Sequence, residues 1–155
     1  MEPLRATTKV RVRYKDTDCM QIVYYGNYLT YFEVGRVEFL RAQGFPMSDV
    51  DRKVHLPVVE AVVRYVRPAR LDDLLEVRCW VSERRRASFR FAYEIVREDG
   101  ATVATGSTLH ACLDPTTGKM IAVPPWLGDI MPVVAGDESA PAAGHLRWRG
   151  SGSSV

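Results

Sequence analysis

Residues 27–44 read NYLTYFEVGRVEFLRAQG, and this stretch decides the fold. Asn27 is a suitable N-cap, because its side-chain oxygen can accept a hydrogen bond from a free N–H group of the first turn. The pattern predicts a helix over about 28–43, which Gly44 ends. Apolar residues cover much of its surface, which is typical of a buried helix. Gly35 lies in the middle of the helix, where it would permit close packing against a flat surface.

Strands are predicted on both sides of this helix. Before it, Val10, Val12 and Tyr14 alternate with basic residues, as in a half-buried strand. After a loop over 44–55, alternating apolar residues predict further strands. Each set lines one face of its strand: Pro57, Val59, Ala61, Val63 and Tyr65; then Leu75, Val77, Cys79 and Val81; then Phe89, Phe91, Tyr93 and Ile95.

Turn signals complete the predicted topology. Asp99-Gly100 is a strong hairpin signal, and a last strand over about 102–113 is followed by a turn at Asp114–Gly118. The order is therefore one strand, one long helix and four strands joined mostly by hairpins. This order predicts an α+β fold in which one antiparallel sheet wraps around one buried helix.

The length of 155 residues suits one domain with a substantial core. Pro124-Pro125 marks the end of the compact part, and the sequence after Leu127 becomes rich in Gly, Ala, Ser and Pro. We therefore expect a folded domain over 1–127 and a flexible tail over 128–155.

Composition limits the possible partners and compartments. The formal net charge of +2 is too small to indicate nucleic acid as a partner. Three cysteines without a CxxC pair argue against both a disulfide framework and a zinc site. The N-terminus lacks the apolar core of a signal peptide, and no apolar run is long enough to span a bilayer. We therefore expect a soluble cytoplasmic protein.

The candidate site lies just before the long helix, in the stretch DTDCMQIVYYGNY over 16–28. Free N–H groups at a helix start carry partial positive charge and can polarise a carbonyl group. A nearby carboxylate, Asp16 or Asp18, could attack that carbonyl or activate a water molecule. An Asp-x-Asp pair in a loop also serves commonly as turn chemistry or capping, so spacing alone leaves both roles open.

The longer string RYKDTDCMQIVYYGNYLTYFEVGRVEFLRAQG resembles the signature of the 4-hydroxybenzoyl-CoA thioesterase family, including its YbgC-like acyl-CoA thioesterase branch. The resemblance covers about residues 7–127. It implies the hotdog fold, an antiparallel sheet around a long helix, which agrees with the predicted element order. It also implies a homo-oligomer, a dimer or a tetramer, and neither a metal ion nor a redox cofactor.

The resemblance assigns roles to particular residues. It implies that Asp18 is the catalytic carboxylate, acting as nucleophile or general base, and that the Tyr25 backbone N–H binds the thioester oxygen. Gly26 and Asn27, at the helix start, would lie against the substrate. A further segment, RRRASF over 84–89, resembles the family's contact with the nucleotide end of CoA, through Arg85, Arg86 and Ser88. Guanidinium groups suit phosphate by charge and geometry.

Two positions depart from the family pattern. Gln21 stands where the family usually has glycine, and its side chain would narrow the pocket or donate a hydrogen bond. Tyr25 stands where the YbgC-like branch often has histidine, so no second acid or base is implied there; a tyrosine at this position resembles the 4-hydroxybenzoyl branch. These departures bear on the substrate rather than on the fold.

Other reactive side chains have simpler explanations. Cys19 adjoins the site, but no histidine lies near it in sequence to activate a thiolate. His55 and His110 are expected to be structural, and His145 to be solvated in the tail. Glu33, on the helix, is a minor catalytic candidate, and no G-x-S-x-G motif supports a serine hydrolase.

The sequence thus predicts a thioesterase that hydrolyses the thioester of an acyl-CoA, or of an acyl carrier protein, to a free acid and a thiol. Two alternatives remain open. One is a hotdog dehydratase acting on 3-hydroxyacyl thioesters. That reaction requires a catalytic histidine paired with an acid, and the helix start has no histidine. The other is a non-catalytic acyl-CoA-binding module in which Asp18 only holds a turn. The acyl group cannot be named from the sequence.

Overall fold

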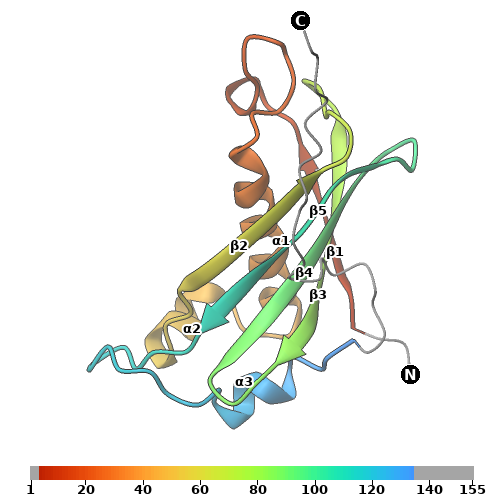
Figure 1. The fold of residues 1–155 in the computed structure, drawn as a ribbon. Helices are drawn as coiled ribbons and strands as arrows, with labels where there is room; N and C mark the ends of the chain where they lie inside the picture. The colour runs from red at the N-terminus through yellow and green to blue at the C-terminus, as the bar shows by residue number, and fades with distance from the viewer. Residues whose placement is uncertain (1–3, 135–155) are drawn as a thin grey trace, which may run out of the picture.

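Five strands form one antiparallel sheet in the computed structural model, which describes residues 4–134. They are β1 (Ala6–Arg11), β2 (Val58–Tyr65), β3 (Leu74–Arg84), β4 (Ser88–Arg97) and β5 (Thr102–Ala111). The spatial order is β1-β3-β4-β5-β2, and each neighbouring pair is antiparallel. The sheet curves around the long helix α1 (Asn27–Ala42), as Figure 1 shows. The predicted order of one strand, a long helix and four strands is confirmed.

Helix α1 packs on one face of the sheet, chiefly against β1 and β3. A Cβ atom on Gly35 would lie 2.8 Å from Val77 Cγ1, so only glycine allows this approach. Nearby, the Phe32 ring stacks on Tyr93 at a centroid distance of 4.2 Å. The predicted role of Gly35 in close packing is therefore confirmed.

The core-facing residues of the two central strands follow the predicted alternation. All are buried: Leu75, Val77, Cys79 and Val81 on β3, and Phe89, Phe91, Tyr93 and Ile95 on β4. The turn between β4 and β5 contains Gly100 at φ +84°, a conformation that favours glycine. Asp114 Oδ1 accepts hydrogen bonds from two backbone N–H groups in the turn after β5. Both predicted turns are confirmed.

The segments at either end of α1 differ from the prediction. Tyr14 is not in the first strand; it begins the 3₁₀ helix η1 (Tyr14–Asp16) and is 83% exposed. The helix α1 begins at Asn27 with Gly26 as its N-cap, so the prediction of Asn27 as N-cap is wrong. The predicted loop over 44–55 contains a short helix, α2 (Met47–Lys53), which buries Val50.

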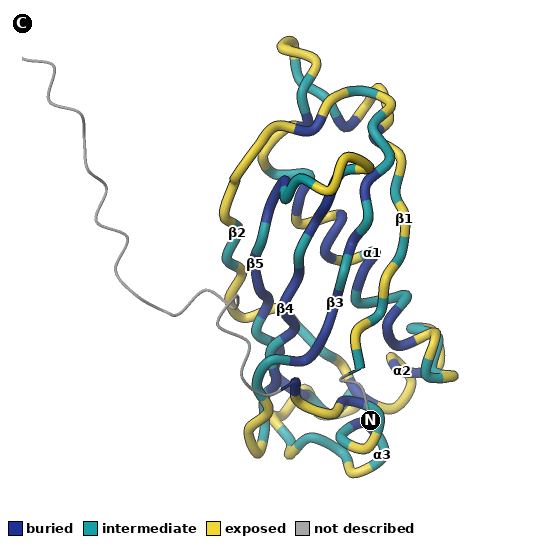
Figure 2. The backbone as a smooth tube through the Cα atoms, turned by 90° about the vertical axis from the view of Figure 1, so that its right-hand side faces the viewer, coloured by how far each residue is buried: buried dark blue, intermediate teal, exposed yellow. Residues whose placement is uncertain are grey.

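Strand β2 is an edge strand, and the alternate residues predicted to share one of its faces are not buried as a set. Val59 and Tyr65 are 57% and 53% exposed, and Val63 is half-buried against the core. The helix makes little contact with this strand, so most of its residues stay exposed. Figure 2 shows β2 as a largely exposed margin beside the buried central strands.

The packed domain continues past the predicted boundary at Leu127. Helix α3 (Pro125–Asp129) is followed by Met131 and Val134, which are both buried. The Val134 N–H donates to the Val81 carbonyl at 2.9 Å and so ties this segment to β3. The rest of the predicted tail, including His145, lies outside the described residues. Within 4–134, no helix is long and apolar enough to cross a membrane.

Candidate active site

Asp16 is a structural carboxylate that holds the turn before α1. It is 5% exposed and accepts hydrogen bonds from the Arg13 backbone N–H (3.0 Å), the Arg13 guanidinium and the Tyr31 hydroxyl (3.0 Å). Burial raises the pKa of Asp16, but these hydrogen bonds outweigh it and leave the pKa below its ordinary value. The role that spacing left open for Asp16 is thus structural, with Tyr31 as a partner that sequence spacing could not identify.

Asp18 lies two residues further, in a tight loop that reverses the chain. Its N–H donates to the Ile22 carbonyl (3.0 Å), and its Oδ1 accepts the Met20 N–H (2.8 Å). The loop is closed by Gln21, which adopts φ +61° and is exposed. One carboxylate oxygen of Asp18 thus fixes the loop, while the side chain stays half-exposed.

The conformation of Gln21 bears on its departure from the family pattern. A left-handed backbone favours glycine, so the loop geometry gives a physical reason for glycine at this position. Gln21 is absent from the residues that line the pocket beside Asp18. The expectation that its side chain narrows this pocket is therefore not met within the described chain.

The turn into α1 leaves backbone N–H groups free. Asn27 N–H donates to the Tyr24 carbonyl (2.9 Å), while the N–H groups of Tyr25 and Gly26 have no backbone partner within 4–134. The Asn27 side-chain amide donates to the Asp16 carbonyl (2.8 Å), which ties the helix start to the acidic turn. Unpaired N–H groups at a helix start can stabilise negative charge on a ligand oxygen.

Asp18 and Tyr25 line the same pocket, a cavity of about 360 Å³. The remaining lining comes from the loop and helix start, and from the end of β2 and the residues after it: Met20, Ile22, Val23, Tyr28, Tyr65, Val66, Arg67 and Pro68. A carboxylate and a helix N-terminus therefore meet at one mostly apolar hollow. This arrangement can hold an acyl group and direct a carboxylate and N–H donors at its carbonyl.

Three tyrosines form an aromatic wall in this pocket. The Tyr65 ring meets those of Tyr25 and Tyr28 edge-on, with centroids 6.5 and 5.3 Å apart. The Tyr65 hydroxyl donates to the Tyr25 carbonyl at 2.9 Å. Tyr28 belongs to the predicted stretch 16–28, whereas no sequence signal placed Tyr65 or Arg67 in the site. Alternation marked Tyr65 only as a strand residue, and nothing local shows that this strand ends beside the acidic loop.

The predicted phosphate-binding residues lie elsewhere in the same chain. Arg85, Arg86 and Ser88 are in or beside the turn between β3 and β4, where Arg85 pairs with Glu83. Ser88 lies seven residues along β4 from Ile95, which is opposite the pocket residue Tyr65 across β5, so the two ends are roughly 24 Å apart. Figure 1 shows this turn beside α3, at the opposite end of the sheet from the start of α1. Within one chain, Arg85, Arg86 and Ser88 therefore lie far from Asp18.

His110 belongs to a buried polar chain beneath α1. Its Nδ1 faces the Leu56 carbonyl (3.0 Å), which only accepts, so Nδ1 carries the proton. Its Nε2 then accepts from Thr108 Oγ1 (2.8 Å), which leaves Tyr93 OH as the donor to Thr108 (2.6 Å). Every polar atom of the ring has a partner, as expected for a structural histidine.

A second cavity, of about 330 Å³, lies beside His110. Its lining includes Glu33 and Arg36 of α1, which face each other at 3.9 Å. Glu33, the minor catalytic candidate, therefore lies in a different cavity from Asp18. Cys19 is exposed and unpaired beside Asp18. In the described part of the chain, no cluster of three or more His, Cys, Asp or Glu side chains could hold a metal ion.

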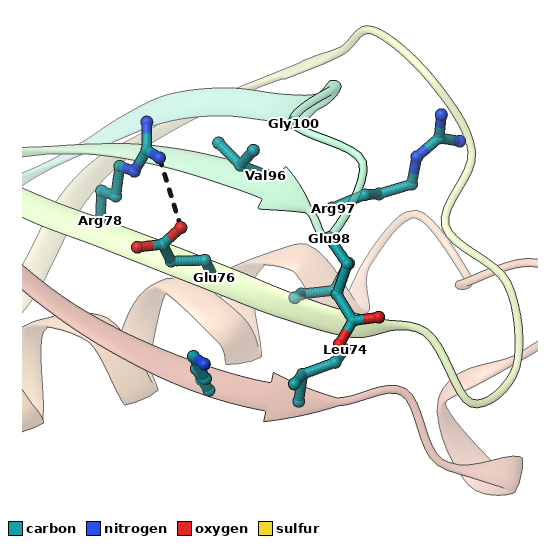
Figure 3. Close-up of a pocket in the computed structure, with 9 residues that line it drawn as sticks. Leu74, Glu76, Arg78, Val96, Arg97, Glu98 and Gly100 are labelled. Carbon is teal, nitrogen blue, oxygen red and sulfur yellow. Dashed lines mark hydrogen bonds and ion pairs between the residues drawn. The ribbon is translucent and has the colours of Figure 1, made fainter.

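A third hollow, on the sheet face away from α1, is shown in Figure 3. Its Arg78 guanidinium points towards Glu76 and also pairs with Glu94, at 3.3 and 2.8 Å. Arg97, at its rim, pairs with Asp99. Acids and bases are balanced here, so the charges favour no ligand of one sign.

Comparison with known proteins places this fold and site in context. The model of the thioesterase-like superfamily matches residues 12–131. The acyl-CoA thioester hydrolase YbgC of Escherichia coli is 34% identical over 116 residues, which cover 74% of this chain and 87% of that protein.

Solved structures agree with the sequence match. The DHNA-CoA thioesterase of Staphylococcus aureus is 32% identical with a TM-score of 0.75, covering 81% of this chain and 85% of that one. A hypothetical protein of Aquifex aeolicus is 33% identical with a TM-score of 0.77, covering 82% and 99%. These matches confirm the hotdog arrangement of one antiparallel sheet around one helix.

Proposed function

This chain belongs to the thioesterase-like superfamily, and we propose that it hydrolyses acyl-CoA thioesters to a free carboxylic acid and CoA. Thioester hydrolysis is the activity that its named relatives share. The observation that carries the proposal to a particular site is that Asp18 and the start of α1 line one mostly apolar pocket. A thioester seated there would have its carbonyl between a carboxylate and free N–H groups.

Asp18 is the catalytic carboxylate in this proposal. Acting as a general base, it would take a proton from water as the water oxygen attacks the thioester carbon. Acting as a nucleophile, it would form a mixed anhydride that water then opens. In both routes the C–S bond breaks, the sulfur leaves as a thiolate that takes up a proton, and the acyl carbon gains one oxygen from water.

The helix start would stabilise the negative charge that develops on the carbonyl oxygen. The Tyr25 N–H, which has no backbone partner in the described chain, is the first donor. Gly26 follows it and leaves the approach to the backbone open, while Asn27 holds the turn through Asp16. Donors fixed before the reaction stabilise a transition state without the cost of reorganisation. Neither a metal ion nor a redox cofactor is needed for this chemistry.

The enzyme is proposed to be a cytoplasmic homo-oligomer whose pocket lies between subunits. Strand β2 exposes an unpaired edge with Val58, Val59 and Val66 beside it, and edges of this kind invite pairing with another strand. Tyr65 and Val66 also line the pocket, so a partner that covers this edge would border the site. Arg85 and Arg86 lie at the end of the sheet opposite to the pocket of their own chain. If they bind CoA phosphates, they would therefore most readily do so for a substrate held in the pocket of another subunit.

Release of free thiol from a panel of acyl-CoAs tests the proposal. The panel contains benzoyl, hydroxybenzoyl, short aliphatic and long aliphatic thioesters, with the same acyl groups on an acyl carrier protein. Turnover of one class by the wild-type enzyme would support the proposal and name the substrate class. Binding of acyl-CoA without thiol release would instead identify a binding module. Hydration or dehydration of 3-hydroxyacyl or 2-enoyl thioesters without thiol release would identify a dehydratase.

A further inference from the structure

The Tyr25 carbonyl lies just outside α1, one residue before the N-cap Gly26. The carbonyl of an N-cap residue accepts the first hydrogen bonds of a helix, and here the Leu29 N–H donates to the Gly26 carbonyl at 3.3 Å. Within 4–134 no backbone N–H pairs with the Tyr25 carbonyl, so this carbonyl has no main-chain donor.

The Tyr65 hydroxyl is the donor to this carbonyl. It comes from the end of β2, forty residues along the chain, and lies 2.9 Å from the Tyr25 carbonyl oxygen. Burial raises the pKa of Tyr65, followed by a smaller effect of the neighbouring Tyr25, so the hydroxyl stays protonated and remains a donor. The edge-on contacts of its ring with Tyr25 and Tyr28 direct the hydroxyl to this carbonyl.

This hydrogen bond acts on a residue of the pocket, because Tyr25 and Tyr65 both line it. It holds the planar peptide unit that follows Tyr25. The preceding unit, which carries the Tyr25 N–H, is fixed by the bond from Asn27 N–H to the Tyr24 carbonyl. The Tyr25 backbone is thus held on both sides, and its own N–H has no backbone partner within 4–134.

We propose that Tyr65 is a positioning residue for thioester hydrolysis: its hydroxyl holds the Tyr25 carbonyl and so keeps the Tyr25 backbone in the orientation in which its N–H can stabilise the oxyanion. The inference rests on the proposed function. Tyr65 would raise the rate without bonding to the reacting atoms. Its effect belongs to the transition state, where charge on the carbonyl oxygen is greatest.

The test compares Tyr65→Phe with wild type on the fastest acyl-CoA of the panel. The ring contacts remain and only the hydroxyl is lost. We expect kcat to fall about tenfold to a hundredfold while KM changes less than about twofold, because the interaction strengthens only as charge develops. Tyr14→Phe is the matched control, since Tyr14 is 83% exposed and outside the pocket lining; it should keep wild-type kcat. Melting temperatures check that both variants fold.

A spectroscopic measurement separates positioning from a general structural role. The probes are ¹³C-carbonyl ketone analogues of benzoyl-CoA and hexanoyl-CoA, in which CH₂ replaces the thioester sulfur. Binding to the wild type should lower the carbonyl stretching frequency, and Tyr65→Phe should bind the same probe with a smaller shift. A folded Tyr65→Phe with wild-type kcat and an unchanged carbonyl shift would overturn the inference, as would a rise in KM alone.

The same experiment distinguishes failure of this inference from failure of the proposed function. If the wild-type enzyme releases thiol and Tyr65→Phe has the same kcat and the same carbonyl shift, thioester hydrolysis is supported and the positioning role of Tyr65 is overturned. If the wild type neither releases thiol nor shifts the carbonyl frequency, the proposed function is overturned, and the role of Tyr65 is overturned with it.

Discussion

At the scale of single residues, Asp16 and Asp18 are separated by only one residue but have opposite environments. Asp16 is buried and fully engaged with Arg13 and Tyr31, whereas Asp18 is half-exposed on a pocket. The family signature singles out the second acid, Asp18, and the structure places that acid, not Asp16, on the pocket. The sequence could not reveal the Tyr31 hydroxyl or the left-handed Gln21, because both depend on how distant segments fold together.

Replacing Asp16 should therefore cost stability. Asp16→Ala leaves the buried Tyr31 hydroxyl and the Arg13 N–H without their acceptor, so we expect a loss of about 2–4 kcal/mol in the free energy of unfolding. Urea unfolding measures this change. Asp18→Ala is the control and should lose less than about 1 kcal/mol, because it removes only the loop bond to Met20. Equal losses for the two variants would contradict the assigned roles.

His110 should make the stability depend on pH. Burial lowers its pKa to about 4; the hydrogen bond to the Leu56 carbonyl opposes this shift, and the nearby charge of Arg36 adds a smaller lowering. Between about pH 6.5 and pH 4 the unfolded chain takes up a proton that the folded chain does not, so stability falls as the pH falls. The loss attributable to His110 is up to about 3 kcal/mol.

Urea unfolding at pH 7 and pH 4.5 tests this linkage. The wild type should lose more stability between these pH values than His110→Gln, which cannot titrate. His55→Gln, a change at an exposed histidine, should keep the wild-type dependence. An identical pH dependence in the wild type and His110→Gln would contradict the account.

At the scale of elements, the helix and the hairpins were predictable and the edges were not. Periodicity and Gly35 were enough to place α1 on the sheet. The helix α2 was missed because seven residues with one buried side chain, Val50, give no periodic signal. The exposure of β2 was missed because alternation describes a strand equally well at the edge of a sheet and at its centre.

Two glycines hold α1 against the sheet, and substituting them should have unequal effects. A Cβ on Gly106 of β5 would overlap the Val62 carbonyl oxygen and lie 2.6 Å from the Phe32 ring, and neither the strand backbone nor the buried ring can retreat. Gly106→Ala should lower the free energy of unfolding by about 3 kcal/mol or more.

Gly35→Ala is the milder partner of this pair. Its new methyl group is too close only to a side-chain methyl of Val77 and meets Cys79 and Tyr93 at ordinary contact distances. Alanine also favours a helix over glycine by about 1 kcal/mol. We expect a net loss of about 1–2 kcal/mol. Chemical denaturation of both variants gives the ranking, and a Gly35→Ala variant less stable than Gly106→Ala would contradict the packing described here.

At the scale of the whole molecule, the site depends on parts of the chain that are remote in sequence. The family signature contained Asp18 and Tyr25, but the opposite wall of the pocket comes from 65–68, at the end of β2. No local pattern brings these segments together; the pairing of β2 with β5 does. Residue spacing likewise gave no indication that Arg85 and Arg86 lie at the other end of the sheet.

The proposed oligomer can be tested through the edge of the sheet. Val59→Lys places a charge on the exposed edge strand, where it would be desolvated if β2 pairs with another subunit. Sedimentation velocity should show an oligomer for the wild type and a shift towards monomer for the variant. Thr117→Lys, in the exposed turn after β5, is the control and should remain oligomeric. A monomeric wild type would contradict the proposed assembly.

Asp18 is the carboxylate proposed to perform thioester hydrolysis at the start of α1. The most direct measurement is kcat for thiol release by the wild type and Asp18→Asn, on the acyl-CoA that turns over fastest, with affinity for that thioester measured in parallel. The account predicts that Asp18→Asn binds the thioester about as tightly as wild type and loses about 10²-fold or more in kcat, the scale of removing a catalytic acid–base group. A folded Asp18→Asn with wild-type kcat would contradict it and leave Asp18 as a turn residue.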